Sequence, residues 1–455
     1  MTELELNERL TKALSGDAWA QNEIGVCYHN GTILGQNYEK AMEWYQRAQA
    51  QGETFSMVNI GILYANGCGV ELNYSTANSW FRKAIENGSA FGMRLLADSY
   101  FYGRGVPQSD EIGIRWLTES ATHQDPCAEF FLAEKYENGT NGLQKDLSKA
   151  IYWYERAGNH GHEIAQYRLG CFYIRATGVA FNPYTAVKWF KLSAERECKE
   201  AIYELGYCYN VGNGVDHNPS EAVRLYKLSA EKGYNQAQYR LGLCYRDGYG
   251  VEKNPLEAFR YFMLASQNGM NEATLQLGFC CRDGFGTEKN ASVAFSHFKD
   301  SALSGNILAT RELGYAYECG LGIEINYNNA FLCYKHVADN SADGWAQNAT
   351  GHFYENGIGT SKNIENAFKY YQLSSSNNWC WGHSNLARLY ENGLGCEQNY
   401  KLAYELYKKS FEGGNENGIL DINRLVKSGL VQDDGTSGAG NGTSSFGDNS
   451  TRPTK

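Results

Sequence analysis

Few residues of this chain have the type and spacing that metal binding or catalysis requires. His160 and His162 form the one close histidine pair, and no cysteine or carboxylate stands near them at the spacing of a zinc site. We interpret this pair as part of an exposed turn. Cys280 and Cys281 are adjacent and no C-x-x-C occurs, which argues against a zinc ribbon or a thioredoxin-like redox site. We expect neither a metal ion nor a cofactor.

Closely spaced glycines superficially resemble phosphate-binding loops. They occur, for example, at residues 103–105, 212–214 and 248–250. A phosphate-binding loop follows a strand and opens a helix, whereas these glycines follow predicted helices and recur at regular intervals. We interpret them as tight turns between helices. Neither a G-x-S-x-G motif nor a kinase signature occurs, so the sequence offers no catalytic residue and indicates a protein that is not an enzyme.

The elements that carry these turns follow a period of about 36 residues. One small residue heads each of eleven copies, which we number in chain order: Gly25, Gly61, Ala97, Ala133, Gly170, Gly206, Gly242, Gly278, Gly314, Gly351 and Ala387. A period in the thirties is typical of stacked supersecondary units. The fold class predicted is therefore all-α, with two antiparallel helices in each copy.

Residues 237–269 show how one copy is built. Apolar side chains at helical spacing predict a first helix that ends at Gly248, a residue suited to the left-handed C′ position. Asn254 is a good N-cap and Pro255 suits the first turn of a second helix. The inner stripe of that helix is formed by Ala258, Tyr261, Phe262 and Ala265. Asn268 and Gly269 end it.

Other copies share these features. A cap asparagine recurs at Asn37, Asn73, Asn182, Asn218, Asn254, Asn290, Asn326, Asn363 and Asn399. A tyrosine follows the heading residue by three positions in ten copies. We interpret the heading glycine as a point of close helix contact, because a Cβ there would hold the second helix away.

This pattern resembles the Sel-1-like repeat, a relative of the tetratricopeptide repeat. Residues 201–215, AIYELGYCYNVGNGV, match the first half of the family's repeat, and residues 41–48, AMEWYQRA, match the second half. The resemblance covers about nine tenths of the chain. It implies a right-handed α-solenoid of about eleven repeats that scaffolds or adapts other proteins. Members include regulatory subunits of fungal chitin synthase, the adaptor of ER-associated degradation and bacterial host-interaction proteins.

Composition and sequence ends narrow these possibilities. The net charge is −10 with both signs mixed along the chain, which argues against a nucleic-acid partner. No apolar run is long enough for a signal peptide or a membrane span, and no prenylation box closes the chain. Several cysteines fall two residues after the heading residue, where we expect buried free thiols. We therefore expect a cytoplasmic protein without membrane insertion.

The chain divides into four parts. Residues 1–15 form an N-terminal lead-in, and residues 16–414 form the array of eleven repeats. Residues 415–430 carry apolar side chains at helical spacing and look like a capping helix. Residues 431–455 are rich in Gly, Ser, Thr, Asn and Asp, and we interpret them as a disordered tail.

First helices of such a solenoid line its concave surface, so variable positions on them are candidates for binding. Aromatic residues and arginine dominate interface energies. The candidate protein-binding residues are Tyr167, Tyr203, Tyr207, Tyr239, Leu243, Arg246, Phe279, Arg282, Tyr315, Trp345 and Trp381. The two arginines form an expected basic patch, and Glu318, Glu355 and Glu391 form an acidic stretch beyond it. Alternatively, some of these aromatic residues simply pack between neighbouring repeats.

The sequence thus favours a non-catalytic scaffold or adaptor that binds extended or helical segments of partner proteins on its concave face. Two alternatives stay open. The chain could be a regulatory subunit of a membrane enzyme or a kinase, recruited through its partner, as the chitin synthase regulators are. A hydrolase is the remaining alternative, and polar residues converging in one pocket would favour it.

Overall fold

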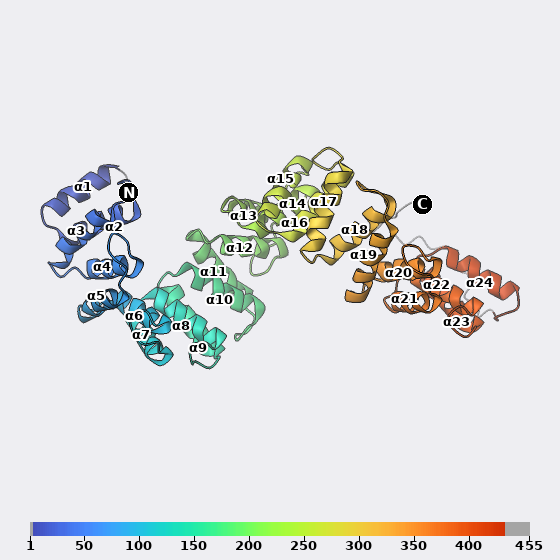
Figure 1. The fold of residues 1–455 in the computed structure, drawn as a ribbon, viewed down its shortest axis with the longest axis horizontal. Coiled ribbons are helices and arrows are strands. Elements are labelled where there is room, and N and C mark those ends of the chain that lie inside the picture. Colours follow the sequence, from blue (N-terminus) through green and yellow to red (C-terminus); the bar gives the residue numbers. More distant parts are fainter. Residues whose placement is uncertain (1–2, 433–455) are drawn as a thin grey trace. The chain divides into compact units, whose positions relative to one another are not determined.

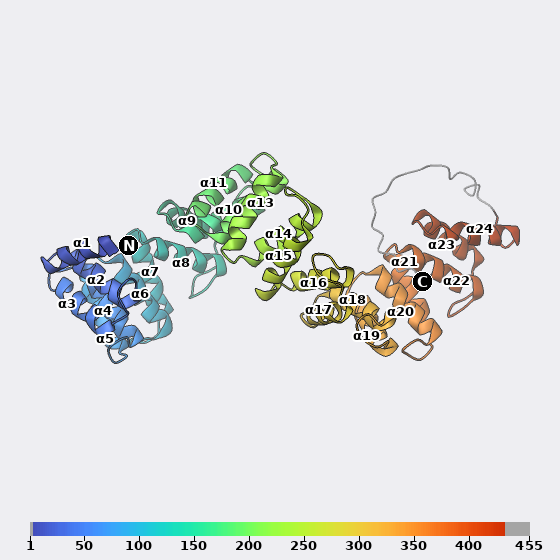
Figure 2. The same cartoon turned by 90° about the horizontal axis from the view of Figure 1, so that it is seen from above.

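The structure is a computed structural model and describes residues 3–432. Over this range it contains 24 helices and no strand, which confirms the all-α prediction. The chain divides into two compact units, and the boundary lies between Tyr234 and Asn235 in the sequence. Each unit is an α-solenoid of consecutive antiparallel helix pairs. Figures 1 and 2 show the helix pairs in order along each unit.

Unit 1 contains thirteen helices. They are α1 (Glu3–Leu14), α2 (Ala18–Asn30), α3 (Tyr38–Gln49), α4 (Thr54–Asn66), α5 (Tyr74–Glu86), α6 (Ala90–Tyr102), α7 (Asp110–Thr122), α8 (Pro126–Asn138), α9 (Leu147–Asn159), α10 (Glu163–Arg175), α11 (Pro183–Glu195), α12 (Lys199–Val211) and α13 (Pro219–Glu231). The even-numbered helices are the first helices of copies 1 to 6. The lead-in contains α1, which packs Leu6 and Ala13 against α2.

Unit 2 contains eleven helices. They are α14 (Asn235–Asp247), α15 (Pro255–Gln267), α16 (Asn271–Asp283), α17 (Ala291–Leu303), α18 (Ile307–Cys319), α19 (Tyr327–Asn340), α20 (Gly344–Asn356), α21 (Ile364–Ser376), α22 (Cys380–Asn392), α23 (Tyr400–Glu412) and α24 (Asn417–Lys427). Helices α14, α16, α18, α20 and α22 are the first helices of copies 7 to 11. Helix α24 follows the last pair and buries Ile422 and Leu425 against α23. The expected tail lies outside the described residues from 433 onward.

Asparagine begins most second helices, as predicted. Each of the nine cap asparagines accepts a hydrogen bond from the backbone N–H three residues on, for example Asn254 from Glu257 at 3.2 Å. Ser109 and Asp146 make the same contact in copies 3 and 4. Such a cap is worth about 1 kcal/mol, which explains why a short polar side chain occupies this position in every copy.

Glycine ends nearly all first helices in the left-handed conformation. Gly212 has φ 76° and its N–H bonds back to the carbonyl of Cys208. In copy 5, Ala176 takes the same place with φ 54°. Alanine reaches this region at a steric cost that glycine does not have, so copy 5 ends its first helix with local strain.

The heading glycine lies against an aromatic ring of its own second helix. A Cβ on Gly242 would stand 2.6 Å from Cε1 of Phe262, and one on Gly314 would stand 2.7 Å from Cε1 of Tyr334. Real Cβ contacts are essentially never this short, so the helices could approach this closely only at glycine. The predicted role of the heading glycine is confirmed.

Copy 3 reverses this arrangement. Its heading residue is Ala97, and Leu117 stands where the other second helices carry an aromatic ring. The ring comes instead from the first helix, because Phe101 packs on Gly113 of α7, where a Cβ would be 2.5 Å away. The large and the small residue of the contact have therefore changed helices in this copy.

Candidate functional site

The predicted binding residues all lie on first helices. We call the surface formed by these helices the first-helix face of each unit. Side chains link neighbouring first helices along it, for example Arg94 to Asp125 at 3.2 Å in unit 1 and Arg311 to Asp343 at 3.0 Å in unit 2. Helices α20 and α22 also contact each other directly. Successive first helices are therefore close enough for one bound segment to touch several copies.

The three tyrosines three residues before the heading residue pack inward. Each ring lies against the second-helix ring of its own copy, with centroid distances of 6.3 Å for Tyr167–Phe190, 5.5 Å for Tyr203–Tyr226 and 6.0 Å for Tyr239–Phe262. Tyr203 is only 8% exposed. Tyr167 and Tyr239 keep part of their surface exposed. These rings pack mainly in the core, and only Tyr167 and Tyr239 keep part of their surface exposed to solvent.

The residues directly after the heading residue differ in exposure. Tyr207 is 37% exposed, whereas Leu243, Phe279 and Tyr315 are partly buried. Phe279 makes an edge contact with Phe298 at 5.4 Å. Tyr207 therefore offers the largest free aromatic surface at this position.

The two predicted tryptophans lie in different surroundings. Trp345 meets Tyr334 edge-on at 5.0 Å and lies under the guanidinium of Arg311 at 5.6 Å. Trp381 is 46% exposed. An exposed tryptophan on a repeat surface is a strong potential anchor for a partner.

Arg246 and Arg282 are held by acidic neighbours. The guanidinium of Arg246 binds both carboxylate oxygens of Asp247 at 2.7 and 2.9 Å, and Arg282 binds Asp283 in the same way at 2.8 and 2.9 Å. Arg282 also reaches Glu312 on α18 at 3.3 Å. Two arginines thus meet three carboxylates, and this part of the face carries no excess positive charge.

The predicted acidic stretch turns toward the helix pairs. Tyrosine hydroxyls of the second helices donate to Glu318, Glu355 and Glu391 at 2.6, 2.8 and 2.9 Å, from Tyr334, Tyr371 and Tyr407. Tyr154 donates to Glu137 at 2.7 Å in copy 4. A buried hydroxyl needs such a partner, because leaving it without one costs about 1–3 kcal/mol.

A rule visible in the sequence accompanies this contact, although we did not predict it. Six copies carry tyrosine at this place in the second helix, and each has a residue that can accept a hydrogen bond four positions after its heading residue: His29, Glu137, Asn210, Glu318, Glu355 and Glu391. The other five copies carry phenylalanine or leucine there, and their matching residues are Ala65, Phe101, Ile174, Arg246 and Arg282. The two helices of a copy are thus matched to each other.

In three copies an arginine from the next even-numbered helix completes the contact, and in unit 1 this is Arg168 on α10, which binds Glu137. Arg388 on α22 binds both oxygens of Glu355 at 2.7 Å, and Arg424 on α24 binds Glu391. Burial alone would raise the pKa of Glu355, but its hydrogen bonds from Arg388 and Tyr371 hold that pKa below the ordinary value. The bond from Arg424 lowers the pKa of Glu391 in the same way.

In unit 1 three carboxylates on first helices have no such partner. Asp98 on α6, Glu134 on α8 and Glu204 on α12 make no hydrogen bond and no ion pair with any residue between 3 and 432. Burial raises the pKa of all three carboxyls. Sequence reasoning missed them, although acidic residues directly after the heading residue in copies 3 and 4 depart from the apolar pattern of copies 6 to 9.

The histidine pair has structural partners. The Nδ1 atom of His160 lies 2.7 Å from the fully buried carboxylate of Glu129, which also accepts a hydrogen bond from Arg156 at 2.9 Å. His162 caps α10 through the N–H of Ala165 at 3.2 Å and stacks on Phe130 at 4.4 Å. The histidines therefore fix the turn between α9 and α10. No group of three or more metal-ligating side chains is found within residues 3–432.

Among the described helices, none has both the length and the apolar character needed to cross a bilayer. The chain is similar to two solved Sel1-type structures. One is c5321, described as a protective antigen present in uropathogenic Escherichia coli strains, with 26% identity, a TM-score of 0.79 and coverage of 94% of this chain and 91% of that one. The other is a Sel1 repeat protein from Oxalobacter formigenes, with 24% identity, a TM-score of 0.50 and coverage of 69% and 91%. No curated protein matches the chain.

The Sel1 repeat pattern matches eleven successive segments, at residues 20–53, 54–89, 90–125, 128–162, 164–198, 199–234, 235–270, 271–306, 307–339, 346–379 and 382–415. These segments coincide with the helix pairs from α2–α3 to α22–α23. The chain therefore belongs to the Sel1 repeat family.

Proposed function

We propose that this chain is a non-catalytic scaffold or adaptor whose first-helix face binds segments of partner proteins. The observation that supports this most is the contrast within that face. Most of the predicted aromatic residues pack inward, yet Tyr207 and Trp381 among them keep 37% and 46% of their surface exposed on first helices. Exposed aromatic anchors on a rigid repeat surface are typical of protein-binding sites.

The proposed contact residues fall into two sets, one for each unit. In unit 1 they are Tyr167, Tyr203 and Tyr207. In unit 2 they are Tyr239, Leu243, Arg246, Phe279, Arg282, Tyr315, Trp345 and Trp381. Within these sets we expect Tyr207 and Trp381 to contribute most, and Tyr203 least, because Tyr203 is nearly buried.

We further propose that the partner is a protein rather than a nucleic acid and that the complex forms in a reducing compartment such as the cytoplasm. The net charge of −10 disfavours a phosphate backbone as a ligand. The thirteen cysteines lie as free thiols, and Cys208 and Cys280 among them are buried in the core. Free core thiols in such number are typical of reducing surroundings.

Site-specific photo-crosslinking tests this proposal. A crosslinking amino acid is placed at Tyr207 or Trp381 on first helices, and at Tyr184 or Leu332 as controls, which are 76% and 60% exposed on second helices. We expect the same partner at both first-helix positions and not at the controls. Alanine at Tyr207 or Trp381 should then weaken the purified complex by about 10-fold or more. Crosslinks confined to the second-helix positions would overturn the proposal.

A further inference from the structure

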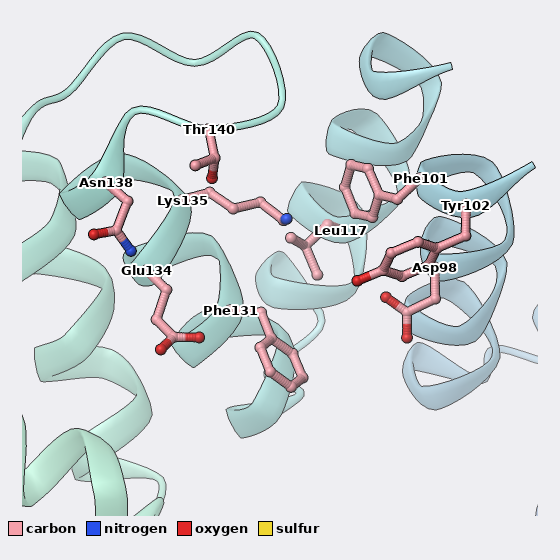
Figure 3. Close-up of a pocket in the computed structure, with 9 residues that line it drawn as sticks. All are labelled: Asp98, Phe101, Tyr102, Leu117, Phe131, Glu134, Lys135, Asn138 and Thr140. Carbon is pink, nitrogen blue, oxygen red and sulfur yellow. The ribbon is translucent and has the colours of Figure 1, made fainter. Parts of the chain in front are cut away.

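A pocket of about 330 Å³ opens on the first-helix face of unit 1 between copies 3 and 4. Helix α6 and helix α8 form its walls, and Leu117 of α7 forms part of its floor (Figure 3). The charged and aromatic residues that line it and carry the argument below are Asp98 and Tyr102 on α6, and Phe131, Glu134 and Lys135 on α8. Asp98 and Glu134 hold the same register position in successive copies, directly after the heading residue.

The pocket exists because copies 3 and 4 depart from the repeat pattern. Phe101 turns inward onto Gly113, and the small Leu117 replaces a ring. Lys135 takes a position whose counterparts are buried in the other ten copies. Its ammonium group lies over the ring of Phe101 at 4.2 Å and donates to Asn141 at 2.6 Å. Lys135 thereby lines one end of the pocket, with its ammonium group held by Asn141 and the ring of Phe101.

The two carboxylates of the pocket make no hydrogen bond or ion pair within the described residues, whereas the cations around them contact other groups. Near Asp98, Arg94 binds Asp125, Arg104 lies over the ring of Tyr102 at 5.0 Å, and Lys135 is held by Asn141. Near Glu134, Arg168 binds Glu137, and Lys135 is the other nearby cation. Both carboxylates are partly desolvated, and the nearby positive charges, Lys135 among them, offset the penalty of their burial only in part, because the pKa of each carboxyl stays raised. A cation entering the pocket would remove that penalty.

Aromatic surface completes the pocket. Phe131 is 38% exposed and Tyr102 is 67% exposed, although both line a recess. In the view of Figure 3 the ring of Phe131 lies between the carboxylates of Asp98 and Glu134. Ring faces and carboxylates together suit a planar, delocalised cation, which stacks on the rings while its N–H groups pair with the oxygens.

We propose that this pocket binds the guanidinium group of an arginine side chain in a partner protein, and this inference rests on the proposed function. Arginine fits better than lysine for two reasons. Its guanidinium is flat and more weakly hydrated than an ammonium, so it loses less on entering a half-dry pocket. It also has enough N–H donors to reach two carboxylates at once.

Saturation-transfer NMR with short capped peptides tests the pocket directly on the full chain. The probes are acetyl-Gly-Arg-Gly-amide and its citrulline counterpart, which keeps the shape but lacks the charge. We expect transfer to the arginine peptide, none to the citrulline peptide, and loss of the arginine signal in the Asp98→Asn, Glu134→Gln double variant. The Glu86→Gln, Glu195→Gln variant is the control, because it removes two exposed charges from second helices of unit 1. It should leave the signal unchanged.

Random 12-residue peptides selected on the full chain separate this inference from the proposed function. We expect selected peptides to be rich in arginine, and replacing that arginine by citrulline should weaken binding by about 30-fold or more. Peptides that bind the first-helix face equally well with citrulline would overturn the arginine pocket and leave the scaffold function standing. The pocket is also overturned if neither probe peptide shows transfer, or if both do so equally. Failure to select any peptide would count against the proposed function itself.

Discussion

Two groups of acidic residues on first helices are treated in opposite ways: those four positions after the heading residue in copies 4, 10 and 11, and those that lie elsewhere on first helices of unit 1. Glu137 in unit 1, and Glu355 and Glu391 in unit 2, each accept a tyrosine hydroxyl and an arginine from the next even-numbered helix. In unit 1, Asp98, Glu134 and Glu204 have no hydrogen bond or ion pair within the described range. One repeat architecture thus uses some first-helix carboxylates to join copies, in both units, and leaves others in unit 1 without a hydrogen bond or ion pair.

This contrast separates stability from binding. A satisfied carboxylate strengthens the fold but has little left to offer a ligand, whereas a desolvated free one weakens the fold and attracts a cation. Proteins commonly accept such local destabilisation where they bind or react. The difference indicates which acidic residues of a repeat array to test first for function, because composition alone treats all of them as equal.

The largest effect should come from breaking the contacts of Glu355. Glu355→Ala leaves the buried hydroxyl of Tyr371 without its partner and frees Arg388, so we expect a loss of about 3 kcal/mol in the local opening free energy. Hydrogen exchange followed by mass spectrometry measures this in α20, α21 and α22. Protection in unit 1 serves as the internal control. Unchanged protection in these three helices would show that the contacts contribute little.

The opposite sign is expected in unit 1. Asp98→Asn with Glu134→Gln removes two desolvated charges and keeps the shapes, so we expect α6 to α8 to gain about 1 kcal/mol of opening free energy. The Glu86→Gln, Glu195→Gln variant provides the baseline for loss of charge alone. A clear loss of protection in the pocket variant would mean that these carboxylates are already satisfied in solution.

Acidification should weaken the contrast between the two groups of carboxylates, because protonation changes their contributions to stability in opposite directions. The pKa of Asp98 is raised above its ordinary value of 3.8, so its contribution to stability is fully present below about pH 3.8 and is lost as the pH rises through the folded value. The pKa of Glu355 is lowered from 4.5, so its contribution is present above about pH 4.5 and is lost as the pH falls through the folded value.

Urea unfolding of the wild type, the Glu355→Ala variant and the Asp98→Asn, Glu134→Gln variant at pH 7 and pH 4 tests these opposite pH dependences. The difference in unfolding free energy between the wild type and the Asp98→Asn, Glu134→Gln variant should shrink at pH 4. Protonation removes the negative charges of the wild type there, as the substitutions do in the variant. We expect a change below about 1 kcal/mol. A difference that grows at pH 4 would reverse the assigned direction.

The smallest expected effect on stability concerns the end of one helix. Ala176→Gly relieves the left-handed alanine that ends α10, and we expect a gain of about 0.5 kcal/mol after the extra freedom of glycine in the unfolded chain is counted. Thermal unfolding with Ala65→Gly, a helical position, as a destabilising control measures it. A loss in the Ala176→Gly variant as large as in the control would show that φ 54° carries no strain.

The features that the sequence predicted correctly are those that depend on interactions within one copy. Asparagine caps, glycine stops and the heading glycine depend on neighbours within one copy, and all were found where expected. The charge pairs were not predicted, because Arg246 folds back onto Asp247 rather than pointing outward, and Arg388 reaches the preceding copy. The pocket was missed since it depends on how side chains of α6 and α8 face each other across copies.

The matching of tyrosine to a polar partner also limits how such an array can be rearranged by recombination. A crossover between the two helices of a copy would join, for example, the tyrosine helix α21 to a first helix like α4, which has Ala65 where α20 has Glu355. The hydroxyl of Tyr371 would then be buried without an acceptor, at about 1–3 kcal/mol. Duplication or exchange of whole helix pairs avoids this loss. The helix pair is therefore the smallest segment that recombination can insert, delete or exchange while keeping each tyrosine matched to its acceptor.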